Sequence, residues 1–365
     1  MRVALIHPFL FRYARGIERF TFNLSNALSA RGVEVHLLTW QWQDKVQIDL
    51  LRECIQVHVM PTSRYYAAQA VIPFYAWHLA RQKYDWVWIY FAGYGEAQAL
   101  TLSRHQRFGI VLHYPLAQVP HRYREFQKYG LARRAAQIVS VTQYVAQGAD
   151  VFFGRQSAVI YYGVETERFK PDPRRRQTLR KSLQIEADAP LLVTAAALEE
   201  RKGVQWILRA LPQVIAKYPS VTYLVLGDGE YLDALKTIAA ELNLTQHVRF
   251  LGAQSDITPF YQAADLSLIL ARGEASSLAA LESLACQLPV IASQQPPFDE
   301  LIRAEYGILV DEQAPAQVGS AIISLLDSPD VRQRMGATGR RHIIENFSWN
   351  RAAQKYIELM ERERR

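Results

Sequence analysis

The sequence is poor in cysteine and has no long hydrophobic run. Its two cysteines, Cys54 and Cys286, lie far apart, and neither belongs to a CxxC pair or a Cys/His cluster. We therefore expect neither a disulfide framework nor a zinc site, and we predict a reducing, cytoplasmic environment. The first apolar run, Val3 to Ile6, is too short for the core of a signal peptide, and no later run approaches the roughly 18 residues of a membrane span.

The composition favours a two-domain globular protein with anionic partners. The chain has 365 residues, half of them hydrophobic, and a net charge of +7. That length exceeds what one hydrophobic core usually organises, so two domains are expected. The net positive charge is compatible with a phosphorylated substrate, nucleic acid or an acidic bilayer.

A basic segment lies between Thr101 and Ala135, where a single acid, Glu125, accompanies seven cations. These are Arg104, Arg107, Arg122, Arg124, Lys128, Arg133 and Arg134. The segment is either a solvated helix face or a contact with anionic lipid at the inner membrane face, worth about 1 kcal/mol per well-placed cation. Nucleic acid is not an expected partner, because the segment lies inside a strand–helix pattern and not on a recognisable binding module.

Short apolar runs alternate with longer amphipathic stretches, which is the βαβ pattern of parallel sheets covered by helices. The pattern occurs twice and predicts an α/β fold. The predicted strands of the first series are 3–6, 33–39, 86–90, 109–113, 138–141 and 158–161, and those of the second are 191–196, 222–226, 248–251, 266–270, 290–292 and 308–310. Prolines 171 and 173 and the run Arg174–Arg176 predict a break in regular structure, so we expect domains at 1–168 and 169–348 and a final helix at 349–365.

The loop 271–278 is the richest of those that follow a predicted strand. Ser276 or Ser277 is a natural N-cap for a helix from Leu278 to Cys286, and the N–H groups of its first turn suit a diphosphate. Glu274 precedes that turn, and Glu282 lies about one turn deeper, about 6–8 Å away. Two carboxylates flanking a diphosphate suit a nucleotide-sugar. The alternative is an ordinary cap with two dipole-favoured surface glutamates.

The stretch from Glu274 to Ala292 resembles the E-x7-E donor motif of the retaining family 4 glycosyltransferases, known as glycosyl transferases group 1. Further ordered resemblances extend along nearly the whole chain. They are the glycine loop at Gly16-Ile-Glu18-Arg19, the hinge from Gly163 to Pro171, Lys202-Gly203, Gly227-Asp-Gly229, the short helix Tyr261–Asp265 and the terminal helix with Trp349.

The resemblance implies a GT-B fold, in which two Rossmann-like domains face each other across a cleft. The first domain would take the acceptor and the second a nucleotide-sugar donor, and no metal or other cofactor would be required. Glu274 would hold the transferred sugar, Glu282 the ribose and Lys202 the diphosphate, while Gly16 and His113 would approach the sugar from the first domain. Ser276, Ser277, Leu278 and Gly227 would complete the donor site.

The sequence also departs from the family pattern. Ala197 stands where a second cation on the diphosphate is usual. Arg201 could replace it, although neighbouring side chains usually point in different directions. Arg15, Tyr114 and Tyr162 replace a glycine, an aspartate and an asparagine of the family, and these changes collect on the acceptor side.

Two other functions remain open at this stage. One is a non-catalytic GT-B subunit that binds a donor or a partner, and the other is a nucleotide-sugar epimerase, which would need further acids and bases that the sequence does not gather. A hydride-transfer enzyme loses its best support, because Leu232 stands where the third glycine of GxGxxG belongs. The acceptor is open among lipid carriers, glycans and small molecules, and the donor sugar, its base and the oligomeric state are open too.

Overall fold

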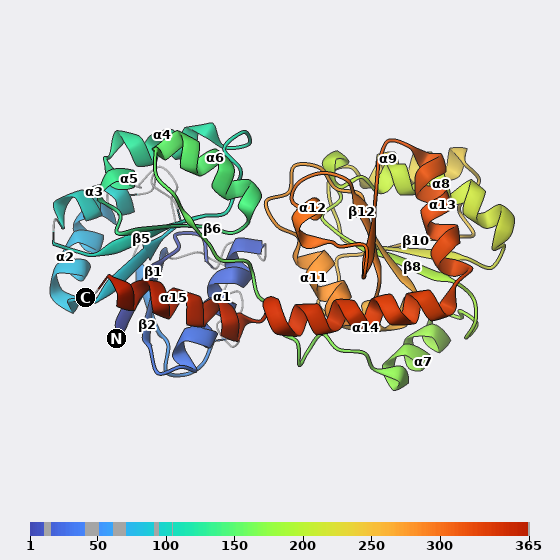
Figure 1. Ribbon diagram of the computed structural model, residues 1–365, viewed down its shortest axis with the longest axis horizontal. Coiled ribbons are helices and arrows are strands. Elements are labelled where there is room, and N and C mark those ends of the chain that lie inside the picture. Colours follow the sequence, from blue (N-terminus) through green and yellow to red (C-terminus); the bar gives the residue numbers. More distant parts are fainter. Residues whose placement is uncertain (11–15, 41–50, 61–70, 91–94, 104, 364–365) are drawn as a thin grey trace. The chain divides into compact units, whose positions relative to one another are not determined.

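The computed structural model describes residues 1–10, 16–40, 51–60, 71–90, 95–103 and 105–363. Arg15 and Arg104 therefore lie outside the described residues. The chain divides into two compact units, one formed by residues 1–163 and 349–365 and the other by residues 164–348. Each unit is an α/β domain, in agreement with the predicted fold class (Figure 1).

The first unit contains a parallel sheet in the order β3-β2-β1-β4-β5-β6-β7. Its strands are β1 (Arg2–Ile6), β2 (Glu34–Trp40), β3 (Gln56–Met60), β4 (Trp86–Ile89), β5 (Phe108–Leu112), β6 (Gln137–Ser140) and β7 (Ala158–Val159). Its helices are α1 (Gly16–Ser29), α2 (Ile72–Gln82), α3 (Glu96–Leu102), α4 (Pro120–Lys128), α5 (Leu131–Arg134), α6 (Gln143–Phe153) and α15 (Trp349–Arg362). The order of the strands reverses between β1 and β4, as in a doubly wound sheet.

The second unit contains a parallel sheet in the order β10-β9-β8-β11-β12-β13. Its strands are β8 (Leu191–Ala195), β9 (Thr222–Leu226), β10 (Val248–Gly252), β11 (Leu266–Ile269), β12 (Val290–Ser293) and β13 (Gly307–Val310). Its helices are α7 (Pro173–Ser182), the short 3-10 helix η3 (Glu200–Lys202), α8 (Val204–Lys217), α9 (Leu232–Glu241), α10 (Thr258–Ala263), α11 (Leu278–Ala285), α12 (Phe298–Leu301), α13 (Pro315–Leu326) and α14 (Pro329–Asn346). Here the order reverses between β8 and β11.

Hydrophobic periodicity explains how the helices cover the sheets. In α8, residues Val204, Ile207, Leu208, Leu211 and Val214 recur at the spacing of one helix face, and all five are buried. The strands beneath are buried along nearly their whole length, as expected for parallel strands covered on both faces. This pattern predicted twelve of the strands.

Two expectations about the elements were wrong. The sequence pattern missed β3, whose residues alternate between polar and apolar at the edge of the first sheet. The charged run 174–176 also does not interrupt regular structure, since it lies in α7, capped by Asp172. The reason is that Arg176 and the buried Arg180 both pair with Asp265, at 2.7 and 2.8 Å, which attaches α7 to the second unit.

The final helix belongs to the first unit. It begins at Trp349, is amphipathic, and lies beside α1 (Figure 1). Trp349 and Tyr356 are buried, and both rings contact Phe20 of α1 edge-on. Within the described residues, no helix is long and apolar enough to cross a membrane.

Candidate functional site

The loops that follow β8 and β11 begin at the switch point of the second sheet. In an open parallel sheet, ligands bind beyond the carboxyl ends of the strands at the place where the strand order reverses. The loop after β8 carries Lys202, and the loop after β11 carries Glu274. The fold therefore brings together the two residues that the sequence singled out 72 positions apart.

Lys202, Arg201 and Glu274 form a charged cluster. The Lys202 Nζ donates to Glu274 Oε1 at 2.7 Å, and the Arg201 Nη1 donates to the same oxygen at 2.6 Å. Glu274 and Lys202 are largely shielded from solvent, whereas Arg201 is about half exposed and also contacts Glu199. Adjacent residues thus reach the same carboxylate, which we had not expected of neighbouring side chains. The arrangement brings two cations to Glu274, although the chain has Ala197 at the position of one cation in the family pattern.

Backbone contacts fix the loop that carries these cations. The Arg272 N–H donates to the Arg201 carbonyl at 2.7 Å, which joins the two loops directly. Gly203 follows with φ of +74°, and a Cβ at this position would lie 1.9 Å from the Leu270 carbonyl oxygen. Only glycine fits both the left-handed backbone and this close approach. The Lys-Gly pair therefore has a structural basis.

The amino end of α11 completes this side of the site. Ser277 is the N-cap, and its hydroxyl accepts from the Ala280 N–H at 3.3 Å. The buried Ser276 hydroxyl has no hydrogen-bond partner among the described residues. The first-turn N–H groups, beginning at Leu278, have no partner within the helix and carry its positive dipole end. A phosphate group has oxygens that can accept hydrogen bonds from both the Ser276 hydroxyl and the first-turn N–H groups.

Glu282 lies one turn further along α11 and is 2 % exposed. A carboxylate at such a depth needs hydrogen-bond donors to offset its desolvation. Gly227 follows β9, the neighbour of β8, and its N–H donates to the Gly252 carbonyl at 2.8 Å. Glu282 therefore lies on the helix that follows the Glu274 loop. Gly227 lies after the strand next to β8, from which the Lys202 loop begins.

His113 lies in the first unit, directly after β5. Its Nδ1 is 2.8 Å from the Tyr162 hydroxyl, and its Nε2 has no hydrogen-bond partner among the described residues. Burial lowers the pKa of His113 well below its usual value, and electrostatic interactions with His7 and Arg122 act in the same direction. A neutral imidazole of this kind can accept or donate one hydrogen bond through Nε2.

Gly16 is the exposed first residue of α1, and a Cβ built on it would meet none of the described residues within 4 Å. The space beside it is therefore open. Two of the departures from the family pattern have structural roles, since Tyr162 holds the His113 ring and Tyr114 lies against the Arg122 guanidinium at 4.9 Å.

Sequence reasoning gave no role to two residues near the donor loops. Arg272 follows β11, and its Nε donates to the buried carboxylate of Glu312. Glu312 comes two residues after β13, at a strand's carboxyl end. The rule that ligands lie beyond such ends could have drawn attention to it. No local motif marks the pair, because its members are 40 residues apart.

Two family models match nearly the whole chain. The description "Glycosyltransferase Family 4" matches residues 14–168, and "Glycosyl transferases group 1" matches residues 175–342. The chain is 30% identical over 237 residues to a GDP-mannose-dependent monoacylated alpha-(1-6)-phosphatidylinositol monomannoside mannosyltransferase of Corynebacterium glutamicum, which covers 62% of each protein. It is 31% identical over 220 residues to a D-inositol 3-phosphate glycosyltransferase of Thermobispora bispora, which covers 56% of the chain and 51% of that protein.

These alignments span about three fifths, or less, of the curated relatives' length. Solved structures share the fold over the whole chain. Anabaena HepE in complex with UDP superposes with a TM-score of 0.83 at 20% identity, covering 99% of this chain and all of that one. WaaG, a glycosyltransferase of lipopolysaccharide biosynthesis, superposes with a TM-score of 0.72 at 19% identity and covers 98% of this chain and 99% of that one. The matched models, the E-x7-E spacing of Glu274 and Glu282 and the GT-B fold agree, and the chain belongs to the family 4 glycosyltransferases of glycosyl transferases group 1.

Proposed function

We propose that this protein transfers a sugar from a nucleoside-diphosphate sugar to an acceptor hydroxyl, with retention of configuration at the anomeric carbon. The observation that carries the proposal is the cluster of Lys202, Arg201 and Glu274 at the switch point of the second sheet, beside the amino end of α11. Two cations and a helix amino end suit a diphosphate, and a neighbouring carboxylate suits the hydroxyls of a sugar.

In this proposal the donor replaces the contacts that Glu274 now makes. The diphosphate takes the ammonium of Lys202 and the guanidinium of Arg201, and Glu274 turns to hydroxyls of the transferred sugar. Glu282, deeper on α11, accepts from the ribose. The first unit supplies the acceptor side, with the neutral ring of His113 and the open backbone of Gly16 near the sugar.

The cations act mainly on the leaving group. As the glycosidic bond breaks, negative charge grows on the diphosphate, and Lys202 stabilises that charge more strongly than it stabilises the intact donor. Loss of Lys202 should therefore slow the reaction more than it weakens donor binding. Retention is explained by attack on the same face, with the leaving phosphate taking the acceptor proton, so we assign no enzymic nucleophile.

A non-catalytic donor-binding or partner subunit is the second candidate. It is favoured by Ala197, which leaves one family cation missing, while the contacts of Arg201 with Glu274 favour the active enzyme. A nucleotide-sugar epimerase would need further acids and bases around the sugar, whereas the side chains that pair with Glu274 among the described residues are the cations of Arg201 and Lys202.

Donor binding can be tested by thermal shift with UDP-, GDP- and ADP-sugars. A ligand that binds only the native protein at about 100 times its Kd stabilises it by about 2.7 kcal/mol. We expect one nucleotide class to raise the melting temperature of the wild type and of the control Glu241→Ala, and to have no effect on Glu282→Ala. Glu241 is exposed at the end of α9, away from the site. If no donor at millimolar concentration changed the melting temperature of the wild type, the proposal of an active transferase would be contradicted.

The same donor then separates an enzyme from a binding subunit. Hydrolysis of the donor, in which water takes the sugar and the nucleoside diphosphate is released, provides a turnover measurement that needs no other acceptor. We expect Lys202→Ala to retain most of the thermal shift and to lower kcat by about 10²–10³. A wild type that binds the donor and releases no nucleotide, even slowly, would favour the non-catalytic subunit.

We also propose that the first unit contacts the surface of an anionic membrane. Arg124 and Lys128 of α4 and Arg133 of α5 are exposed, and none of them forms an ion pair among the described residues. The curated relative from Corynebacterium glutamicum is named for a phosphatidylinositol mannoside, so a lipid acceptor at the inner face of the membrane is a candidate for this chain. Glycans and small molecules are the other candidates.

A further inference from the structure

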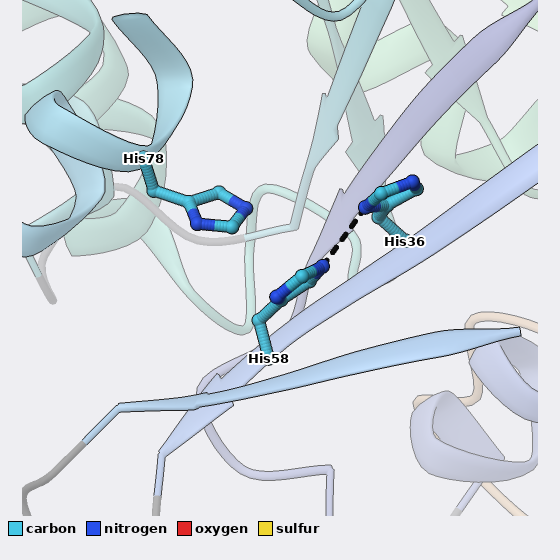
Figure 2. A group of neighbouring side chains, drawn as sticks. All are labelled: His36, His58 and His78. Carbon is cyan, nitrogen blue, oxygen red and sulfur yellow. Dashed lines mark hydrogen bonds between the residues drawn. The ribbon is translucent and has the colours of Figure 1, made fainter. Parts of the chain in front are cut away.

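Three histidines from separate elements of the first unit face one another. His36 lies on β2, His58 on the edge strand β3 and His78 on α2, and Figure 2 shows the His78 ring directed from its helix toward the other two. Each offers one ring nitrogen, and the three nitrogens lie within 4.8 Å of one another. His36 and His78 are almost fully buried, and His58 is partly exposed. Together we call them the histidine cluster.

A carboxylate fixes the tautomer of His36. Its Nε2 lies 3.0 Å from Glu34 Oε1. A carboxylate only accepts hydrogen bonds, so this nitrogen carries the proton, and in the neutral ring the lone pair is on Nδ1. Histidines that bind metals commonly donate their second N–H to a carboxylate in this way. The lone pair of Nδ1 faces the other histidines.

The lone pair of His36 is shared by two neighbours. Its Nδ1 is 2.8 Å from His58 Nε2, as the dashed line of Figure 2 marks, and 3.0 Å from the Tyr84 hydroxyl. That hydroxyl also lies 2.7 Å from His78 Nε2. One in-plane lone pair accepts only one hydrogen bond with good geometry, whereas all three imidazoles can direct lone pairs toward a cation between them.

We propose that the histidine cluster binds one divalent transition-metal ion, for which zinc is the probe. Zinc takes imidazole nitrogens at about 2.0–2.1 Å, which in a tetrahedron places them about 3.3 Å apart. The cluster reaches this spacing if the His58 nitrogen moves about half an ångström away from His36 Nδ1, from its present 2.8 Å, and the His78 nitrogen moves toward the other two. The Tyr84 oxygen or a water would occupy the fourth position. Three imidazoles also suit copper and nickel.

The metal would tie together the edge of the sheet. Among the described residues, β3 is the edge strand of the sheet and pairs with β2 alone. His36 is the third of seven residues in β2 and His58 is the middle one of five in β3, so the cluster does not lie at the carboxyl ends of these strands, where ligands of parallel sheets bind. Its role would be to stabilise the fold, independently of the proposed sugar transfer.

The experiment measures zinc binding by tag-free protein. Protein stripped with a chelator is titrated with zinc in competition with a chromophoric chelator, and the metal content after dialysis is measured by mass spectrometry. We expect one zinc per chain, an affinity at least about 100-fold lower for His58→Gln, and one about 10–100-fold lower for Glu34→Gln, which removes only the outer carboxylate. His105→Gln, which changes an exposed histidine of the same unit, should bind zinc as the wild type does.

Cobalt provides a measurement that does not depend on any variant folding. Addition of one equivalent of Co²⁺ to the wild type should produce the intense visible absorption of a four-coordinate site. Far-UV circular dichroism identifies any variant that loses structure. Wild-type protein that binds no stoichiometric zinc and gives no such cobalt spectrum would overturn the proposal, as would a folded His58→Gln protein with unchanged affinity. None of these measurements requires a sugar donor.

Discussion

Gly203 sets the position of the preceding lysine. Its left-handed φ turns the chain from η3 into α8, and its missing side chain lets Leu270 approach from the end of β11. Through this contact the loop with Lys202 lies against the loop with Glu274. A residue without any charge thus determines where the charged groups meet.

We expect Gly203→Ala to destabilise the second unit by at least about 3 kcal/mol, because the new methyl group adds a backbone clash to about 1–2 kcal/mol of left-handed strain. Gly252→Ala is a matched control, since Gly252 has φ of +68° and nothing within 4 Å of its Cβ position. The control should lose only the strain. Urea denaturation measures the free energy of unfolding of both variants. Equal decreases for the two would show that the close approach to Leu270 does not contribute to the effect of Gly203→Ala.

At the scale of single residues, the sequence singled out the side chains of the predicted donor site but not their contacts. The E-x7-E spacing identified Glu274 and Glu282, and the cap preference narrowed the N-cap to two serines, of which the structure selects Ser277. The approach of Arg201 to Glu274 could not be predicted, because it depends on how two distant loops pack. The histidine cluster was missed for the same reason, since its members are spaced 22 and 20 residues apart and form no local motif.

At the scale of elements, buried parallel strands were predicted well and exposed elements poorly. Strands such as β8 and β9 appear as continuous apolar runs with glycine or proline nearby. The edge strand β3 has polar residues at alternate positions and so resembles a loop. Helix α7 was missed because the prolines and arginines around its start were expected to interrupt regular structure, whereas two of its arginines reach the carboxylate of Asp265.

The exposed cations of α4 and α5 lead to a prediction about membranes. We expect the triple variant Arg124→Gln/Lys128→Gln/Arg133→Gln to lower binding to vesicles that contain phosphatidylglycerol by about 100-fold, at about 1 kcal/mol per cation. Arg122 and Arg134 are left unchanged, because Arg122 lies against Tyr114 and Arg134 donates to the Leu100 carbonyl. Vesicle sedimentation at low salt measures the effect.

The control for this prediction removes the same charge from α7. Arg174→Gln/Arg175→Gln/Lys181→Gln changes three exposed cations of the second unit. If both triple variants weaken vesicle binding equally, net charge and not the α4–α5 surface is responsible. If neither variant changes it, the proposed membrane contact is wrong.

At the scale of the whole molecule, the buried histidines of the described residues all belong to the first unit. They are His7, His36, His78 and His113, whereas buried glutamates occur in both units, Glu18 and Glu96 in the first and Glu282 and Glu312 in the second. Six of the seven tryptophans also belong to the first unit, so intrinsic fluorescence follows mainly its unfolding. The first unit is therefore the one expected to respond to mild acid.

His7 allows this response to be assigned to one residue. Burial lowers its pKa from 6.5 to about 3, despite the Glu18 carboxylate 3.7 Å from Nε2, so the folded protein keeps the ring neutral. The unfolded chain takes up a proton below pH 6.5. The stability that the neutral ring contributes is therefore complete above pH 6.5 and is lost as the pH falls toward 3, by up to about 1.4 kcal/mol per pH unit.

We expect His7→Asn to reduce this acid sensitivity. Asparagine can keep the hydrogen bond that Nδ1 now forms with the Thr21 hydroxyl at 2.9 Å, and it does not titrate. Between pH 6.0 and 4.5 the wild type should lose about 2 kcal/mol more than the variant, because one proton uptake by the unfolded chain has been removed. Urea unfolding followed by tryptophan fluorescence measures the slope, with the exposed His105→Asn as control. Parallel pH profiles for the wild type and His7→Asn would mean that the folded protein protonates His7 as readily as the unfolded chain does.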